Sequence, residues 1–203
     1  MNLISILSAD SISSVSVMVN SELLETLTTD ENYSHSKVLP VYINDLLKKY
    51  QLINLDGLVV SIGPGSYTGL RIGISLAKGF AFSKNIPLIP ISTFDIIKYN
   101  VDIESSYSIL VHSHRHFYFK QSYSGLNRKG KPELVDINTF KDTTIYYTGN
   151  EHLDKKYPNY VNHQLDSETM LKIGLKHFDS MIVKDINSVT PMYVSNITLN
   201  KND

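Results

Sequence analysis

The sequence predicts an α/β protein with two lobes, in which helices cover mixed β-sheets. Three short apolar segments follow one another in the first 28 residues, and helical and strand patterns then alternate up to about residue 92. A second series of strand patterns starts after about residue 100. We therefore expect the two lobes to divide near residues 98–105.

The first lobe should begin with strands. Residues 3–7 are apolar and β-branched, valines alternate along residues 15–19, and residues 23–27 have a similar character. Short connections make these strands a meander. A helix is expected over about residues 35–50, because residues 34–36 suit a helix start and large apolar side chains then recur at helical spacing.

The next segments alternate between strand and helix. Residues 57–62 are almost continuously apolar, which indicates a buried strand. A glycine-rich turn should lead into a helix over about residues 68–84, followed by a short strand at residues 88–91. This order predicts a mixed sheet that is covered by helices.

The second half contains a further set of strand patterns. Residues 107–123 indicate a β-hairpin, and residues 144–147 indicate another strand. Residues 125–132 are polar and predict a turn. A helix is expected over residues 167–178, with Ser167 as its cap.

The composition excludes several classes of protein. Of the 203 residues 42% are hydrophobic and 19% charged, so the chain is not intrinsically disordered, and no apolar run approaches the ~18 residues of a membrane span. Since 19 Lys and Arg residues balance 20 Asp and Glu residues, neither half of the chain is a basic nucleic-acid clamp, and if the protein serves RNA we expect it to do so through a partner. Cysteine is absent and no secretion signal is evident, so we expect a cytoplasmic protein.

The most informative stretch is the turn after the strand at residues 57–62. It lies between a buried strand and a helix, where backbone N–H groups can contact phosphate. The candidate phosphate contacts are Gly63, Gly65, Ser66, Thr68 and Gly69. Their spacing matches neither a P-loop nor a dinucleotide fingerprint, and turn geometry with close packing explains the same residues.

Small residues recur every four positions along the following helix: Gly69, Gly73, Ala77 and Ala81. Glycine within a helix is about 1 kcal/mol less favourable than alanine, so Gly73 and Gly79 indicate a compensating close approach of another backbone. Either the sheet beneath the helix or the helix of a partner protein can supply this approach.

These residues resemble the TsaB (YeaZ) family of glycoprotease-like proteins, which serve bacterial tRNA threonylcarbamoyladenosine biosynthesis. The resemblance is carried by the run from Gly63 to Gly73 and by Ala77-Lys78-Gly79, and more weakly by Asp10-Ser11, Ser34-His35-Ser36 and Pro191-Met192-Tyr193-Val194. It covers about residues 1–99 and the C-terminal end.

The resemblance implies an actin-like ATPase (ribonuclease H-like) fold. A first lobe over residues 1–99 would carry the pairing helices. A reduced second lobe would occupy residues 100–203, and its C-terminal segment would return to the first lobe.

The resemblance also implies a subunit without catalysis of its own. It would pair with a TsaD-like catalytic subunit and, together with a TsaE-like ATPase, support threonylcarbamoyl transfer to the adenosine beside the tRNA anticodon. The same face would allow a homodimer. We expect no cofactor for the chain itself, and the interface with the partner is the candidate place for ATP or ADP. The partner-binding residues carried onto this chain are Leu39, Ile43, Leu47, Arg71, Ser75 and Lys78.

Asp10 is the remaining candidate for nucleotide chemistry. An actin-like ATPase needs a glycine after this aspartate, but residues 11–14 include none, and bulkier residues hinder close approach to phosphate. Asp10 is either a nucleotide-metal remnant that holds a magnesium-bound water or a cap of the turn after the first strand. A small actin-fold kinase or hydrolase is therefore the alternative function.

Three alternating histidines form another candidate site. If His112, His114 and His116 lie on one extended strand, they share a face and can bind zinc or nickel, whereas a turn between them would leave a solvated loop. His112 and His116 also match the letters of HxxxH, but that motif requires a helix. We therefore expect no metal site, and a metallopeptidase is the less favoured alternative.

Overall fold

The computed structural model describes residues 1–29, 34–140, 144–149, 153 and 159–194. The chain divides into two compact units. Unit 1 comprises Met1–Ile96 and Leu165–Met192, and unit 2 comprises Ile97–Gln164 with the residues from Tyr193 onward. Both units are therefore discontinuous in sequence, and the larger part of unit 2, Ile97–Gln164, is inserted within unit 1.

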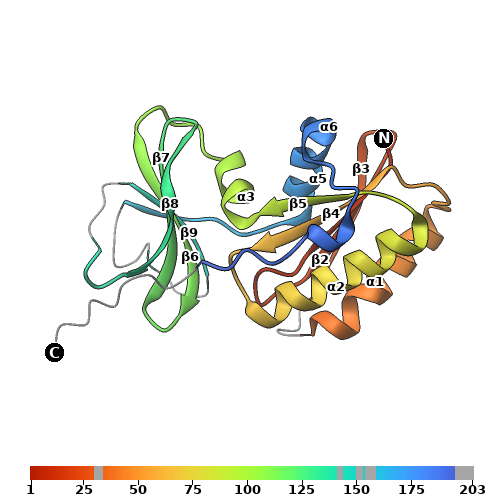
Figure 1. Cartoon of the computed structure of the whole chain (residues 1–203), viewed down its shortest axis with the longest axis horizontal. Coiled ribbons are helices and arrows are strands. Elements are labelled where there is room, and N and C mark those ends of the chain that lie inside the picture. The colour runs from red at the N-terminus through yellow and green to blue at the C-terminus, as the bar shows by residue number, and fades with distance from the viewer. Residues whose placement is uncertain (30–33, 141–143, 150–152, 154–158, 195–203) are drawn as a thin grey trace. The chain divides into compact units, whose positions relative to one another are not determined.

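The sheet of unit 1 has five strands in the order β3-β2-β1-β4-β5 (Figure 1). β1 (Leu3–Leu7), β2 (Ser14–Val19) and β3 (Glu22–Thr28) form an antiparallel meander. β4 (Gly57–Gly63) and β5 (Leu88–Ser92) extend the sheet in parallel beyond β1. The predicted meander and the predicted mixed sheet are both confirmed.

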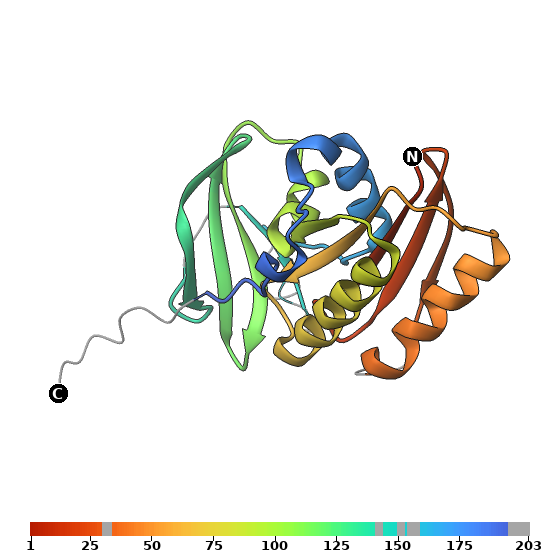
Figure 2. The same ribbon diagram turned by 45° about the vertical axis from the view of Figure 1, so that its right-hand side comes forward.

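Two long helices cover one face of this sheet. α1 (His35–Lys49) and α2 (Tyr67–Lys84) lie side by side on it, as Figure 2 shows. Ile6 of β1 belongs to the same buried core as Leu39 of α1 and Ala77 of α2. Both predicted helices therefore form, with their small and apolar side chains against the strands.

The opposite face of the sheet is covered by the later part of unit 1. α5 (Ser167–Lys176) packs against the strands, and the short α6 (Phe178–Met181) follows it. Leu3 and Leu7 of β1 share a second core with Met170 of α5. Successive residues of β1 thus enter different cores, as expected for a strand with both faces buried.

A chain of buried hydroxyl groups joins α5 to the sheet. Ser16 Oγ lies 2.5 Å from Ser167 Oγ, and Ser5 Oγ donates to the carbonyl oxygen of Ser167 over 2.8 Å. The prediction that Ser167 caps α5 is wrong. Asp166 is the N-cap, and its carboxylate accepts a hydrogen bond from Thr169 N over 2.5 Å. Ser167 instead docks the helix on the strands.

The sheet of unit 2 also has five strands, in the order β10-β9-β6-β7-β8. The strands are β6 (Ser106–His114), β7 (Phe117–Ser124), β8 (Asn127–Asp136), β9 (Ile145–Thr148) and β10 (Tyr160–Asn162). β7 is antiparallel to both β6 and β8, whereas β9 runs parallel to β6 and to β10. The predicted hairpin and the predicted strand near residue 145 are confirmed.

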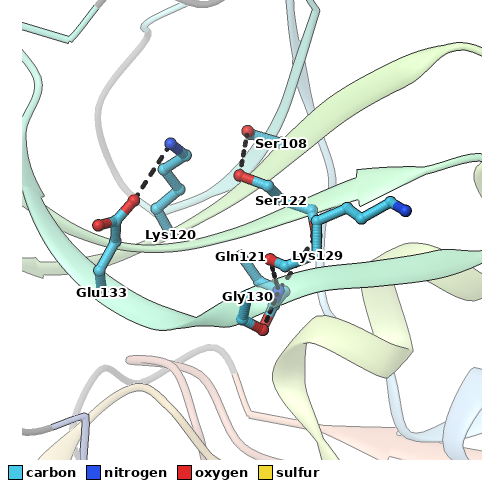
Figure 3. A network of polar contacts seen from close by, with 7 residues as sticks. All are labelled: Ser108, Lys120, Gln121, Ser122, Lys129, Gly130 and Glu133. Carbon is cyan, nitrogen blue, oxygen red and sulfur yellow. Dashed lines mark hydrogen bonds and ion pairs between the residues drawn. The ribbon is translucent and has the colours of Figure 1, made fainter.

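β8 overturns the prediction of a turn over residues 125–132. It is an edge strand, where Gly130, Pro132 and exposed charges are tolerated. Its pairing with β7 is irregular near the buried Gln121. As Figure 3 shows, the Gln121 amide donates there to Lys129 O over 3.0 Å and to Gly130 O over 3.5 Å. A side chain thus satisfies carbonyl groups where the ladder is interrupted.

Short helices that were not expected from the sequence also form in the described part of the chain. α3 (Thr93–Tyr99) starts directly after β5, with Asp95 N donating to Ser92 Oγ over 3.1 Å. η1 (Ile186–Ser188) is a single 3₁₀ turn near the end of unit 1. Across the part of the chain that the structure describes, every helix falls short of the length or apolar character that a membrane crossing requires.

Candidate functional site

The glycine-rich turn at residues 63–66 brings the start of α2 against the segment that follows β1. Gly63 has a φ of +94°, a left-handed conformation that favours glycine. Ser66 is the N-cap of α2, and its hydroxyl oxygen accepts from Gly69 N over 3.2 Å. Ser66 N donates to Ala9 O over 2.7 Å. Two N–H groups of the predicted phosphate loop are therefore bonded within the chain.

Residues 8 and 9 lie directly against the glycine-rich turn and the first half of α2, so glycine is required at three positions. A Cβ atom on Gly65 would fall closer than 3.0 Å to Ala9 O, and one on Gly69 would fall equally close to Ser8 O. A Cβ atom on Gly73 would collide with the Ser8 side chain. The chain's own backbone thus supplies the close approach that the small-residue ridge predicts at its N-terminal end.

The other members of the predicted nucleotide site have local roles or face solvent. The carboxylate of Asp10 accepts a hydrogen bond from Ser11 N over 2.7 Å, as expected for a cap of the turn after β1. Thr68 is exposed in the first turn of α2. Within the described residues, no cluster of three His, Asp or Glu side chains could hold a metal ion. Nucleotide binding at these positions stays a prediction.

A buried histidine lies beside this turn, and sequence reasoning treated it only as part of a helix start. Ser13 Oγ and His35 Nδ1 form a hydrogen bond inside unit 1, and His35 is 2% exposed. Among the described residues, His35 Nε2 has no hydrogen-bond partner. It faces the start of α2, because a Cβ atom on Gly69 would lie 3.0 Å from it. His35, the first residue of α1, therefore lies against the start of α2.

His35 should make the stability of unit 1 depend on pH. Burial lowers the pKa of His35, and the negative charge of Asp10 only partly opposes this shift. Because the unfolded chain binds the proton more tightly, the free energy of unfolding should fall as pH drops below the ordinary histidine pKa of about 6.5. Urea unfolding at neutral and mildly acidic pH should show this fall.

Burial also lowers the pKa of His163 in unit 2, so His163 is a second source of acid sensitivity. The variant His35→Gln isolates the contribution of His35. The variant should lose the His35 part of the acid sensitivity and retain any contribution from His163. An unchanged pH dependence in the variant would contradict the assignment to His35.

The predicted partner-binding residues divide between core and surface. Leu39 is 0% and Ile43 is 4% exposed, so both lie inside unit 1 rather than on an exposed face. Their recurrence at helical spacing marks the side of α1 that packs on the sheet. Arg71 and Ser75 are exposed on α2, and the half-buried Lys78 Nζ donates to Asn187 O over 3.1 Å.

Leu47 is half-buried at the edge of the α1 core. Of the six predicted positions, those on α2 are thus the more accessible. They lie on one side of that helix, and the exposed residues Tyr67 and Phe82 extend the same side.

Tyr67 and Phe82 were missed as surface residues. The guanidinium carbon of Arg71 lies 3.8 Å from the centre of the Tyr67 ring, which is 56% exposed. Phe82 is 78% exposed. The sequence pattern does not identify either residue, because α2 is nearly apolar all round and its hydrophobic pattern does not distinguish the core side from the outer side. We define Tyr67, Arg71, Ser75, Lys78 and Phe82 as the outer face of α2.

The three alternating histidines, His112, His114 and His116, do not share a site in the structure. β6 ends at His114, and Arg115 has a φ of +52° in the turn that follows. His112 Nε2 lies 3.1 Å from Arg115 O, whereas His116 Nε2 lies 3.4 Å from the carboxylate of Asp136. The turn that the sequence analysis considered is therefore present, and the HxxxH letters do not lie on a helix.

Comparisons with known proteins find similar proteins whose names refer to tRNA modification. Residues 29–129 match the family described as TsaD, tRNA N6-adenosine threonylcarbamoyltransferase. The chain is 39% identical over 61 residues to the tRNA threonylcarbamoyladenosine biosynthesis protein TsaB of Haemophilus influenzae, and 47% identical over 47 residues to that of Bacillus subtilis. These matches cover 29% and 23% of this chain but only 26% and 20% of the two relatives. The chain thus spans about a quarter of the length of the curated relatives that it matches.

Solved structures match over nearly the whole chain. A Pseudomonas aeruginosa protein with similarity to peptidase YeaZ gives a TM-score of 0.80 at 16% identity, covering 96% of this chain and 99% of that one. YeaZ from the same organism gives a TM-score of 0.79, also at 16% identity, and covers 95% and 99%. At such low identity the likeness concerns the fold alone, and the fold has the two mixed sheets with helices that the sequence analysis expected.

Proposed function

We propose that the chain is a TsaB-like (YeaZ-like), non-catalytic subunit that activates a TsaD-like threonylcarbamoyltransferase by docking to it. A TsaE-like ATPase would complete the assembly, which transfers threonylcarbamoyl to an adenosine beside the tRNA anticodon. tRNA would be contacted through the assembly, in the cytoplasm. The chain alone would bind no cofactor, and ATP or ADP would bind at its interface with the partner.

The observation that carries this proposal is the outer face of α2. It exposes two large aromatic rings and an arginine along one side of a helix whose other side packs on the sheet. Tyrosine and arginine are enriched among residues that dominate the energy of protein interfaces. The same face is available to a second copy of the chain, which would form a homodimer when the partner is absent.

The start of α2 favours docking over nucleotide chemistry. Phosphate loops need backbone N–H groups that point to the ligand. Here Ser66 N and Gly69 N already donate to Ala9 O and Ser66 Oγ. The arrangement therefore lends more support to a docking subunit than to a small kinase or hydrolase.

The direct test is to mix the chain with the TsaD-like subunit of the same organism. Size-exclusion chromatography with light scattering should show a one-to-one complex at micromolar concentration. Arg71→Glu should weaken that complex by about tenfold or more, because it removes a central cation and its contact with Tyr67. Lys172→Glu makes the same charge change on an exposed residue of α5 and should leave the affinity within about twofold. Two unshifted peaks for the wild-type pair would contradict the proposed function.

A further inference from the structure

α2 contains one glycine for which the fold gives no reason. A Cβ atom on Gly79 would meet nothing within 4 Å, whereas one on Gly69 or Gly73 would collide with residues near β1. Glycine inside a helix is about 1 kcal/mol less favourable than alanine, so folding alone favours a larger residue at this position. The absence of a side chain at Gly79 is explained if another backbone approaches the helix there from outside.

Gly79 opens onto a hollow in the surface of unit 1. The hollow has a volume of about 540 Å³ and lies between the C-terminal half of α2 and the segment that contains η1. Phe82 and Ile86 contribute apolar surface to its lining, and the Phe82 ring is 78% exposed. We call this hollow the Phe82 groove. An aromatic ring beside a hollow is the kind of surface that protein interfaces bury.

The lining of the Phe82 groove favours an acidic ligand. It includes two lysines, Lys78 and Lys184, and one carboxylate, that of Asp185. Asp185 already accepts a hydrogen bond from Asn187 N over 3.1 Å, and Lys78 donates to Asn187 O. In the described part of the chain, neither lysine forms an ion pair. Each ammonium group therefore retains N–H donors for an incoming carboxylate.

The Phe82 groove is continuous with the outer face of α2, because Lys78 and Phe82 belong to both. We propose that the groove binds a segment of the TsaD-like partner. The backbone of that segment crosses Gly79, a large apolar side chain packs on Phe82, and at least one carboxylate contacts Lys78 or Lys184. This inference rests on the proposed function and deepens it by naming the chemistry of the docked segment.

Two variants test the groove by independent means. Gly79→Leu fills the space above the helix, and it should not destabilise unit 1 because nothing lies within 4 Å of the added Cβ atom. Lys184→Glu reverses one charge of the lining. Each variant should weaken binding of the TsaD-like subunit by about tenfold or more in calorimetric titration, with an unchanged or higher Tm.

Lys84→Glu is the control for charge, because Lys84 is exposed in the last turn of α2 but does not line the groove. Its affinity should stay within about twofold of wild type. Raising the salt concentration should weaken wild-type binding more than binding by Lys184→Glu, because screening acts on the lost ion pair.

The outcomes separate the inference from the proposed function. If the wild-type chain does not bind the TsaD-like subunit, the proposed function fails and the inference fails with it. If the wild type binds and both groove variants bind within about twofold of it, the proposed function stands and the groove inference is overturned. Loss of self-association in Gly79→Leu, with partner binding intact, would assign the groove to a second copy and would also overturn the inference.

Discussion

Gly69→Ala should destabilise unit 1 by about 4 kcal/mol or more, while Gly79→Ala on the same helix should stabilise it by up to about 1 kcal/mol. The first change forces a methyl group against the carbonyl oxygen of Ser8, with His35 Nε2 and Ser66 Oγ only 3.0 Å away. A backbone oxygen at the end of a buried strand cannot move without disturbing the sheet. The second change adds a methyl group in open space. Urea unfolding of the two variants measures both effects.

The pair is informative because it inserts the same atom twice into one helix. Equal and small effects would contradict the close contact between α2 and the segment after β1. Loss of stability in both variants would instead mean that the Gly79 position is enclosed.

Ala77→Glu should prevent folding, whereas Ser75→Glu should give a folded chain that pairs poorly with its partner. Ala77 is fully buried in the core between α2 and the sheet, and an unpaired carboxylate there loses its hydration without compensation. Ser75 is exposed on the outer face of α2. A new negative charge at that position should weaken the complex by about tenfold while leaving the circular dichroism spectrum unchanged.

Ile43→Glu belongs with Ala77→Glu, because Ile43 packs in the same core. A soluble, folded Ala77→Glu protein would show that the helix presents a different side to the sheet. Light scattering with the TsaD-like subunit, combined with thermal unfolding, distinguishes loss of folding from loss of pairing in each variant.

The sequence predicted the elements whose pattern is long and regular. The valines of β2 alternate and the apolar residues of α1 recur at helical spacing, so the strand and the helix were both identified. What the pattern could not provide was the side of α2 that faces the sheet. Since that helix is apolar nearly all round, only the structure separates the buried Ala77 from the exposed Phe82.

The ridge of small residues shows the same limit more sharply. Its spacing predicts close approach but not which neighbour approaches. Gly73 contacts the chain's own Ser8 side chain, while Gly79 faces open space on the same helix. Sequence alone cannot distinguish these environments, because both residues are glycines in an apolar context. What separates Gly73 from Gly79 is the position of Ser8, which is about sixty residues away in the chain.

The errors in unit 2 and α5 have local causes. β8 contains Gly130, Pro132 and several charged residues, which indicate a turn unless the strand lies at the edge of a sheet. Asp166 and Ser167 are both residue types that favour the N-cap position, and the tertiary contacts of Ser167 determine that Asp166 is the cap. The hydroxyl of Ser167 is used by the buried Ser16, so Asp166 is left to cap the helix.

Because unit 1 is discontinuous in sequence, its sheet is synthesised well before the helix α5 that covers one face of it. All five strands of its sheet have been synthesised once residue 92 is made, but α5 follows more than seventy residues later. Until then Leu3, Leu7 and Val59 have no helix to cover them, and the hydroxyls of Ser5 and Ser16 lack Ser167. Unit 2 forms its strands from one uninterrupted stretch and can close first. One face of the sheet of unit 1 therefore stays uncovered until α5 has been synthesised.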